Sequence, residues 1–276
     1  MDTLYDQLLG LQHIPNAYDE WTAYRAALTD FIVTHTKKGT SALIIGAGEC
    51  NDYDLNRMIE HFSEITLLDH NEIAICEGLK HQSVEPVNIR VVKADLLGIP
   101  EDDYRTMCDV LLHEMQRQYR YGKINPDVIV QLFLSQMAAI FQNRHPDQIT
   151  QRDSMADYVI CCGVHSQLIN IFPQMAGVYH RYLKIDIKHI YEVVHSMNTV
   201  IAREFNTRLL RMAKVGVILG LEDSRVGMDG GIEGAAQALE CIQSGNAEIT
   251  NETALIWPFE QSQGKIYIMK VMLLSK

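Results

Sequence analysis

The sequence predicts an α/β fold: a doubly wound, mostly parallel seven-stranded sheet with an antiparallel last strand, N-terminal helices and helical cap insertions. Short apolar segments alternate with segments whose apolar residues recur every three or four positions. Alternating strand and helix units of this kind build a parallel sheet. The last two apolar segments are separated only by the polar turn 260–264, and so short a connection can only join antiparallel strands.

The expected strands are short and bounded by turn residues. The run 41–46 follows the breaker 37–40 and is too short for a helix. Helical spacing follows over 52–61, and the pair repeats as a strand and a helix at 64–69 and 72–80. The full set of expected strands is 41–46, 64–69, 87–93, 157–163, 214–221, 253–259 and 265–274.

Three further regions have helical spacing and lie outside the simple strand and helix alternation. Residues 1–36 are expected to form an N-terminal helical segment that acts as a lid, before a single domain over 37–276. Within that domain, 101–150 and 165–213 are longer than a crossover needs. We expect these two insertions to form a helical cap over the C-terminal edge of the sheet.

Composition narrows the possible partners. The net charge is −11, with 24 basic against 35 acidic residues, which argues against a nucleic-acid partner. No apolar run approaches the roughly 18 residues of a membrane span, and the N-terminus lacks a secretory pattern, so we expect a cytoplasmic protein without a membrane partner. The six cysteines show no C-x-x-C spacing, and no metal site is predicted.

A glycine turn and a distant acid predict a ligand that contains a nucleoside. Gly46-Ala-Gly48 follows the first strand and opens a helix, so main-chain N–H groups can face a ligand. Asp69 ends the second strand, where a carboxylate can accept the hydroxyls of a ribose. A dinucleotide fingerprint would place glycine at Asn51, which disfavours a nicotinamide cofactor and leaves a methyl donor as the better candidate.

The order of segments resembles that of class I S-adenosylmethionine-dependent methyltransferases over about residues 40–276. Segments 43–50, 67–69 and 92–96 resemble three of that family's motifs, 157–163 its fourth strand, and the terminal hairpin its antiparallel seventh strand. The resemblance implies S-adenosylmethionine as the cofactor. The residues that it places at the cofactor are Gly46, Ala47, Gly48, Glu49, Asn51, Asp69, His70, Asn71, Ala94, Asp95, Leu96, Cys162, Gly163 and Val164.

Two positions depart from the pattern of this family. The family often has an acid where this chain has Ile44, and a third glycine where it has Cys50. The amino group of the methionine part is therefore expected to be held by main-chain carbonyls, or by Glu49 or Asp52.

Three segments supply candidates for the acceptor side. His165, after the fourth strand, is the candidate general base or orienting donor, because its unperturbed pKa suits proton transfer near neutrality. Gln167 and Arg225 are candidate substrate-binding residues, with a salt bridge to Asp223 as the alternative role of Arg225. Tyr18 is a third candidate substrate-binding residue and belongs to a set of N-terminal aromatic residues that form either a lid or core packing.

The predicted reaction is methyl transfer, with O-methylation of a peptide C-terminal carboxylate or a natural-product-sized acceptor favoured. The turn 46–52 together with 163–167 resembles stand-alone methyltransferases of modified-peptide biosynthesis, some of which esterify such a carboxylate. The alternatives are O- or N-methylation of a small metabolite, transfer of the aminocarboxypropyl group of the same cofactor, a nicotinamide-dependent reductase, and a cofactor-binding module without turnover.

Overall fold

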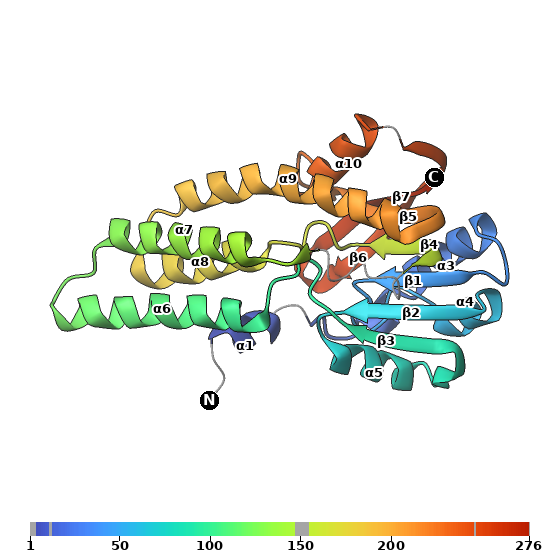
Figure 1. Cartoon of the computed structure of the whole chain (residues 1–276), viewed down its shortest axis with the longest axis horizontal. Coiled ribbons are helices and arrows are strands. Elements are labelled where there is room, and N and C mark those ends of the chain that lie inside the picture. Colours follow the sequence, from blue (N-terminus) through green and yellow to red (C-terminus); the bar gives the residue numbers. More distant parts are fainter. Residues whose placement is uncertain (1–3, 11–12, 147–154, 246, 276) are drawn as a thin grey trace.

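A computed structural model describes residues 4–10, 13–146, 155–245 and 247–275 of the chain. Its centre is a seven-stranded sheet with the strand order β3-β2-β1-β4-β5-β7-β6 (Figure 1). The first five strands are mutually parallel, and β7 is antiparallel to both of its neighbours. The strands are β1 (Ser41–Ile45), β2 (Glu64–Asp69), β3 (Ile89–Lys93), β4 (Ala156–Cys162), β5 (Ala213–Arg225), β6 (Glu248–Glu260) and β7 (Lys265–Ser275).

The predicted fold class is confirmed, and two strands are longer than predicted. β5 was expected to end at Leu221, but it continues to Arg225 because β7 supplies hydrogen-bond partners along its whole length, as far as the pair Arg225 and Tyr267. The polar residues that follow Leu221 therefore lie on a strand beside β7. The prediction that the fifth strand ends at residue 221 was therefore wrong.

Both faces of the sheet are covered, as the apolar sequence of its central strand requires. In β1, Ala42 and Ile44 belong to one buried cluster, and Leu43 and Ile45 to another. The first cluster includes side chains of α3 (Thr22–His35), α4 (Leu55–His61) and α5 (Glu72–His81). The second includes side chains of α9 (Lys188–Met212) and α10 (Ala235–Gln243).

A helical lobe projects beyond the C-terminal ends of the parallel strands (Figure 1). It contains α6 (Glu101–Arg120), α7 (Pro126–Asn143), α8 (Ile171–Leu183), the first half of α9 and the N-terminal α1 (Leu4–Gly10), around a third buried cluster. The second half of α9 packs on the sheet, so this one helix of about 37 Å joins lobe and sheet. None of the described helices is long and apolar enough to cross a membrane.

The N-terminal helices divide between the two parts of the molecule. Tyr5 and Leu8 of α1 are buried in the lobe. After the short α2 (Ala17–Glu20), Trp21 and Tyr24 pack against Trp257 of β6, at ring-centroid distances of 5.0 and 5.7 Å. The aromatic residues of this segment were expected to form either a lid or core packing, and Trp21 and Tyr24 form core.

One helical glycine sets how closely α5 approaches the loop that follows β1. A Cβ atom on Gly78 would lie 2.1 Å from the carbonyl oxygen of Glu49. Gly177 in α8 is also helical, but a Cβ atom there would meet nothing within 4 Å. The two positions form a matched pair, since they share the same gain in helix propensity and differ in available space.

We expect Gly78→Ala to lower the free energy of unfolding by about 1–3 kcal/mol, because the added methyl group overpacks the contact with Glu49. Gly177→Ala should leave it unchanged or raise it by up to about 1 kcal/mol. Urea-induced unfolding of both variants measures the difference. Equal changes in the free energy of unfolding would show that the contact between α5 and the loop at Glu49 is not closely packed.

Candidate functional site

Glycine allows the loop after β1 to lie against the loop after β4. Gly46 has a φ of +70°, and a Cβ atom there would lie 2.4 Å from the side chain of Val164. The N–H groups of Gly46 and Ala47 both donate to the carbonyl oxygen of Leu68, at 2.9 and 3.2 Å. The three neighbouring parallel strands β2, β1 and β4 thus end side by side at one edge of the sheet.

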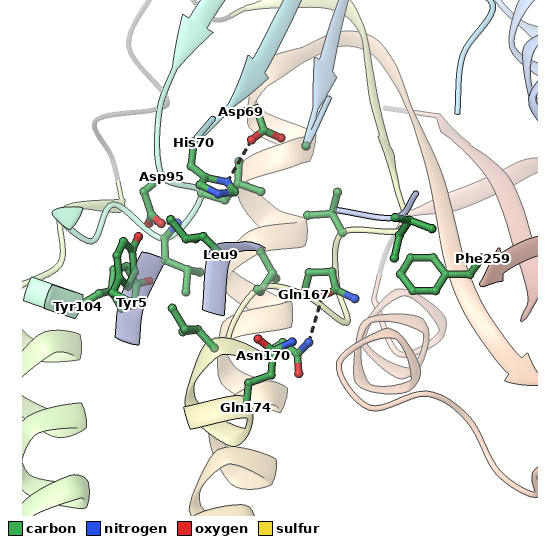
Figure 2. Close-up of a pocket in the computed structure, with 18 of the residues that line it drawn as sticks. Tyr5, Leu9, Asp69, His70, Asp95, Tyr104, Gln167, Asn170, Gln174 and Phe259 are labelled. Carbon is green, nitrogen blue, oxygen red and sulfur yellow. Dashed lines mark hydrogen bonds and ion pairs between the residues drawn. The ribbon is translucent and has the colours of Figure 1, made fainter. Parts of the chain in front are cut away.

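Asp69 ties these loops together through its carboxylate. Oδ2 accepts the N–H of Gly48 at 2.9 Å, and Oδ1 accepts the N–H of Asn71 at 2.9 Å and faces Nδ1 of His70 at 3.0 Å (Figure 2). Burial acts to raise the pKa of Asp69, but these hydrogen bonds outweigh it and leave the pKa below its ordinary value. The hydrogen bond to Asp69 raises the pKa of His70. Asp69 is therefore an ionised carboxylate at the edge of the sheet.

A cavity of about 410 Å³ opens beside these loops. The predicted cofactor residues that line it are Gly46, Asp69, His70, Asp95, Leu96, Gly163 and Val164. Figure 2 shows Asp69, His70 and Asp95 on one side of this cavity and Gln167, Asn170 and Gln174 on the other. The cavity thus joins the ends of four parallel strands or their loops to the lobe.

Asp95 presents a second carboxylate to this cavity. Its Oδ1 accepts the N–H groups of Leu97 and Ile99, both at 2.9 Å, which leaves Oδ2 for a ligand. Burial raises the pKa of Asp95. The arrangement suits an oxygen that accepts from an amino group.

The other predicted cofactor residues do not line the cavity, and the structure shows what they contact instead. Gly48 bonds Asp69, Asn71 accepts the N–H of Ala74 as the N-cap of α5, and Glu49 accepts from Asn51 Nδ2 and faces His13. Ala47 and Cys162 are buried behind the cavity wall. Ala94 donates its N–H to the carbonyl oxygen of Asp69 and so supports the loop after β3.

Asp52, which the sequence suggested for the methionine amino group, also lies outside the cavity lining. Burial and the neighbouring Glu222 raise its pKa to about 7, with Arg25 acting in the opposite direction. Cys50 takes a φ of +55°, so the backbone at this position is left-handed although the residue is not glycine. Contact between Asp52 and an amino group stays a prediction.

A second cavity, of about 640 Å³, lies next to the first on the lobe side. The residues that line both cavities are Gln167, Asn170, Gln174, Phe259 and Tyr267. Trp257 lines the second cavity and would be 2.9 Å from a Cβ atom on Gly163, which lines the first. The two cavities therefore adjoin, and we call the five residues that line both of them the partition.

A chain of hydrogen bonds runs from this partition to a buried acid. Asn170 Nδ2 donates to Gln167 Oε1 at 3.1 Å, and Gln167 Nε2 donates to Ser166 Oγ at 3.1 Å. The hydroxyl of Ser166 then donates to Glu222 Oε1 at 2.6 Å. Gln167, a predicted substrate-binding residue, is thus placed at the partition, and the chain leads to Glu222.

The prediction that His165 is a general base is not supported by its position. The side chain is 1% exposed, lines neither cavity, and bonds through Nε2 to Asn206 Oδ1 at 2.7 Å. Its ring packs edge-on against Phe205 of α9, at a centroid distance of 5.1 Å. Because α9 closes over the loop after β4, His165 faces this helix and links it to the sheet.

Tyr18 and Arg225 also lie away from both cavities. The ring of Tyr18 is covered by Arg25 at 3.8 Å and by His81 at 4.3 Å. Arg225 lies on β5 and donates to the carbonyl oxygen of Gly264. Among the described ion pairs none joins Arg225 to Asp223, and binding of a substrate carboxylate by Arg225 stays a prediction.

Several cavity residues were missed by sequence reasoning. Leu9 and Ile14 come from the N-terminal segment, and Phe259, Lys265 and Tyr267 from the terminal hairpin. Tyr5, one of the aromatic residues considered for a lid, also lines this cavity. Their approach depends on tertiary packing, which no local pattern encodes. Glu222 could have been found, because it follows an apolar strand segment just as Asp69 ends one.

Comparison with solved structures finds similar chains at low identity. TrmK of M. capricolum, in complex with the cofactor product S-adenosyl-homocysteine, has 11% identity, with coverage of 90% of this chain and 67% of that chain and a TM-score of 0.42. Magnesium protoporphyrin IX methyltransferase (ChlM) from Synechocystis PCC 6803 with bound SAM has 11% identity, coverage of 100% and 85%, and a TM-score of 0.43. N-methyltransferase NodS from Bradyrhizobium japonicum WM9 has 10% identity, coverage of 95% and 98%, and a TM-score of 0.48.

No protein-family model matches the sequence, and no curated protein matches it. Because the three TM-scores are below 0.5, we base the function of this chain on its own residues and cavities.

Because His165 is buried, we expect the folding stability of this protein to depend on pH. Burial lowers its pKa to about 4, so between about pH 6.5 and pH 4 the unfolded chain binds a proton that the folded chain does not. Over this range His165 should cost the folded state up to about 3 kcal/mol, a cost absent above about pH 6.5. His165→Gln does not titrate there, so wild type should lose stability relative to the variant as the pH falls.

Urea unfolding at about pH 7.5 and about pH 4.5 measures this change. Asp52 and Glu222, whose pKa values burial raises, act in the opposite direction, but both proteins carry them and their effects cancel in the comparison. A stability difference that stays constant with pH would contradict the burial of a neutral imidazole.

Proposed function

We propose that this chain is an S-adenosylmethionine-dependent methyltransferase whose acceptor binds in the second cavity. The observation that carries the proposal is the pair of adjoining cavities at the edge of the sheet. One presents the ionised Asp69 beside a glycine loop, and the other meets it across a partition. A donor and an acceptor held in these two spaces would approach each other at the partition.

The residues of the first cavity fit this cofactor. Its volume of about 410 Å³ lies in the range of small-molecule sites. Asp69 would accept from a ribose hydroxyl, since a carboxylate offers about four acceptor positions and three are used by Gly48, Asn71 and His70. Asp95 Oδ2 would accept from the adenine amino group. The bound cofactor supplies an activated methyl group on a sulfonium ion.

The contribution of the protein to such a reaction is positioning. Methyl transfer is an in-line displacement, so holding the acceptor atom close to the methyl carbon lowers much of the barrier. The lack of a side chain at Gly163 lets the ring of Trp257 pack closely at the point where the cavities approach. The partition residues Phe259 and Tyr267 would exclude water from it.

The size of the second cavity supports an acceptor of natural-product or short-peptide dimensions. Its volume is about 640 Å³, and its walls combine aromatic rings with amide and carboxylate groups. Methylation of a peptide C-terminal carboxylate, which the sequence analysis favoured, would require that an anion bind beside Glu222. The carboxyl group of Glu222 in this wall disfavours an anionic acceptor.

Calorimetric titration with S-adenosylhomocysteine tests the cofactor, and NADH serves as the comparison ligand. We expect saturable binding of the nucleoside and none of NADH. Asp69→Asn should weaken the nucleoside binding by about tenfold to a hundredfold, because a charged acceptor of hydrogen bonds is lost. Asp127→Asn, at the exposed start of α7, is the matched control and should bind as wild type does.

Binding of NADH alone would overturn the proposal and favour a dinucleotide enzyme. Unchanged affinity of Asp69→Asn for S-adenosylhomocysteine would move the ribose away from Asp69.

A further inference from the structure

Glu222 is a buried acid in the wall of the second cavity. It is 2% exposed and lies on β5 just beyond the apolar run that ends at Leu221. Its Oε1 accepts from Ser166, whose neighbour Gln167 lines both cavities. Only one hydroxyl group therefore separates Glu222 from the partition.

The second oxygen of Glu222 lacks a partner. Oε2 is buried and makes no hydrogen bond, and no Lys, Arg or His of the described residues forms an ion pair with this carboxylate. A buried carboxylate without a cation is strongly destabilising unless a ligand or a proton compensates it. Oε2 thus has a vacant position for a hydrogen-bond donor.

The hydrogen-bond chain favours the ionised form of Glu222. Asn170, Gln167 and Ser166 each donate toward the next member, and the last donor meets Glu222 Oε1. Aligned donors polarise one another and stabilise negative charge at the acceptor end. Burial acts against this and raises the pKa of Glu222, so this carboxyl takes up a proton more readily than an exposed one does.

The rest of the second cavity also suits a cation. Glu233 provides a second, exposed carboxylate, whose Oε1 accepts from Asn198 at 2.8 Å and lies 3.0 Å from Nδ1 of His195. Aromatic rings line the wall, and a cation over such faces is stabilised by the ring quadrupole. Those rings belong to Trp257, Phe259, Tyr267 and Tyr191. Among the described residues, Arg181 is the one basic side chain that lines this cavity.

We infer that the acceptor reacts through an amine nitrogen, and that Glu222 Oε2 receives the proton that this nitrogen loses. The inference rests on the proposed function and names the substrate class of the same site. The bound ammonium group first gives one proton to the ionised Glu222 carboxylate, which frees the nitrogen lone pair. That lone pair forms the bond to the methyl carbon, the carbon–sulfur bond breaks, and its electron pair stays on the sulfur. A carboxylate acceptor has no proton to give and is repelled by Glu222.

Three probes of the same ring size test this inference by calorimetry on the full chain: phenethylamine, phenethyl alcohol and phenylacetate. Each is titrated with and without saturating S-adenosylhomocysteine. We expect phenethylamine to bind about tenfold more tightly than phenylacetate, as a charged hydrogen bond to Glu222 predicts. Glu222→Gln, which keeps the shape of the side chain, should remove this preference.

Asp223→Asn is the matched control, because Asp223 is the next residue of β5 and is exposed. It should keep the preference of wild type. Tighter or equal binding of phenylacetate, tighter binding of the alcohol than of the amine, or no saturable binding of the amine by wild type would overturn the inference. So would an unchanged preference in Glu222→Gln.

The wild-type comparison decides the matter even if Glu222→Gln does not fold. Failure of S-adenosylhomocysteine to bind would count against the proposed function, whereas the amine preference is also measured without that ligand. The two failures are therefore distinguishable.

Discussion

The site depends on one constraint: a single carboxylate holds the ends of two neighbouring parallel strands in register. Asp69 ends β2, yet its Oδ2 accepts the N–H of Gly48 in the loop after β1. This bond fixes the glycine loop against Val164, and the loops after β1 and β4 then form one wall. The carboxylate remains ionised because three donors compensate its burial. A ligand meets a preformed, charged edge.

The second binding space depends on elements far apart in the sequence. The helix α9 carries the lobe at one end and packs on the sheet at the other, so it sets the distance between them. The insertion of β7 between β5 and β6 brings Phe259 and Tyr267 to the partition. Neither cavity would be closed by the parallel strands alone. In the proposed function, the lobe and the hairpin together would limit which acceptor can enter.

Sequence patterns predicted β1, β2 and β4 to within one residue at each end, because each is a short apolar run that is buried on the sheet. They also placed Gly46 and Asp69 at strand ends, where both residues line the first cavity, and cofactor binding by them stays a prediction. They failed for His165, since a histidine after a strand faces either the ligand or a helix, and the packing of α9 decides which. They missed Tyr267 because its place depends on the antiparallel pairing with β5.

Burial of Glu222 without a cation costs folding free energy, and a bound cation would offset that cost. Asp52 and Glu222 interact as two acids in one buried region, and burial raises the pKa of both. Replacing such groups by apolar ones of similar size is often neutral or stabilising in proteins. Buried acids without a cation therefore contribute little to folding, and they concentrate at functional sites. A cation that enters the second cavity would supply the missing partner, which links the charge of the site to its choice of acceptor.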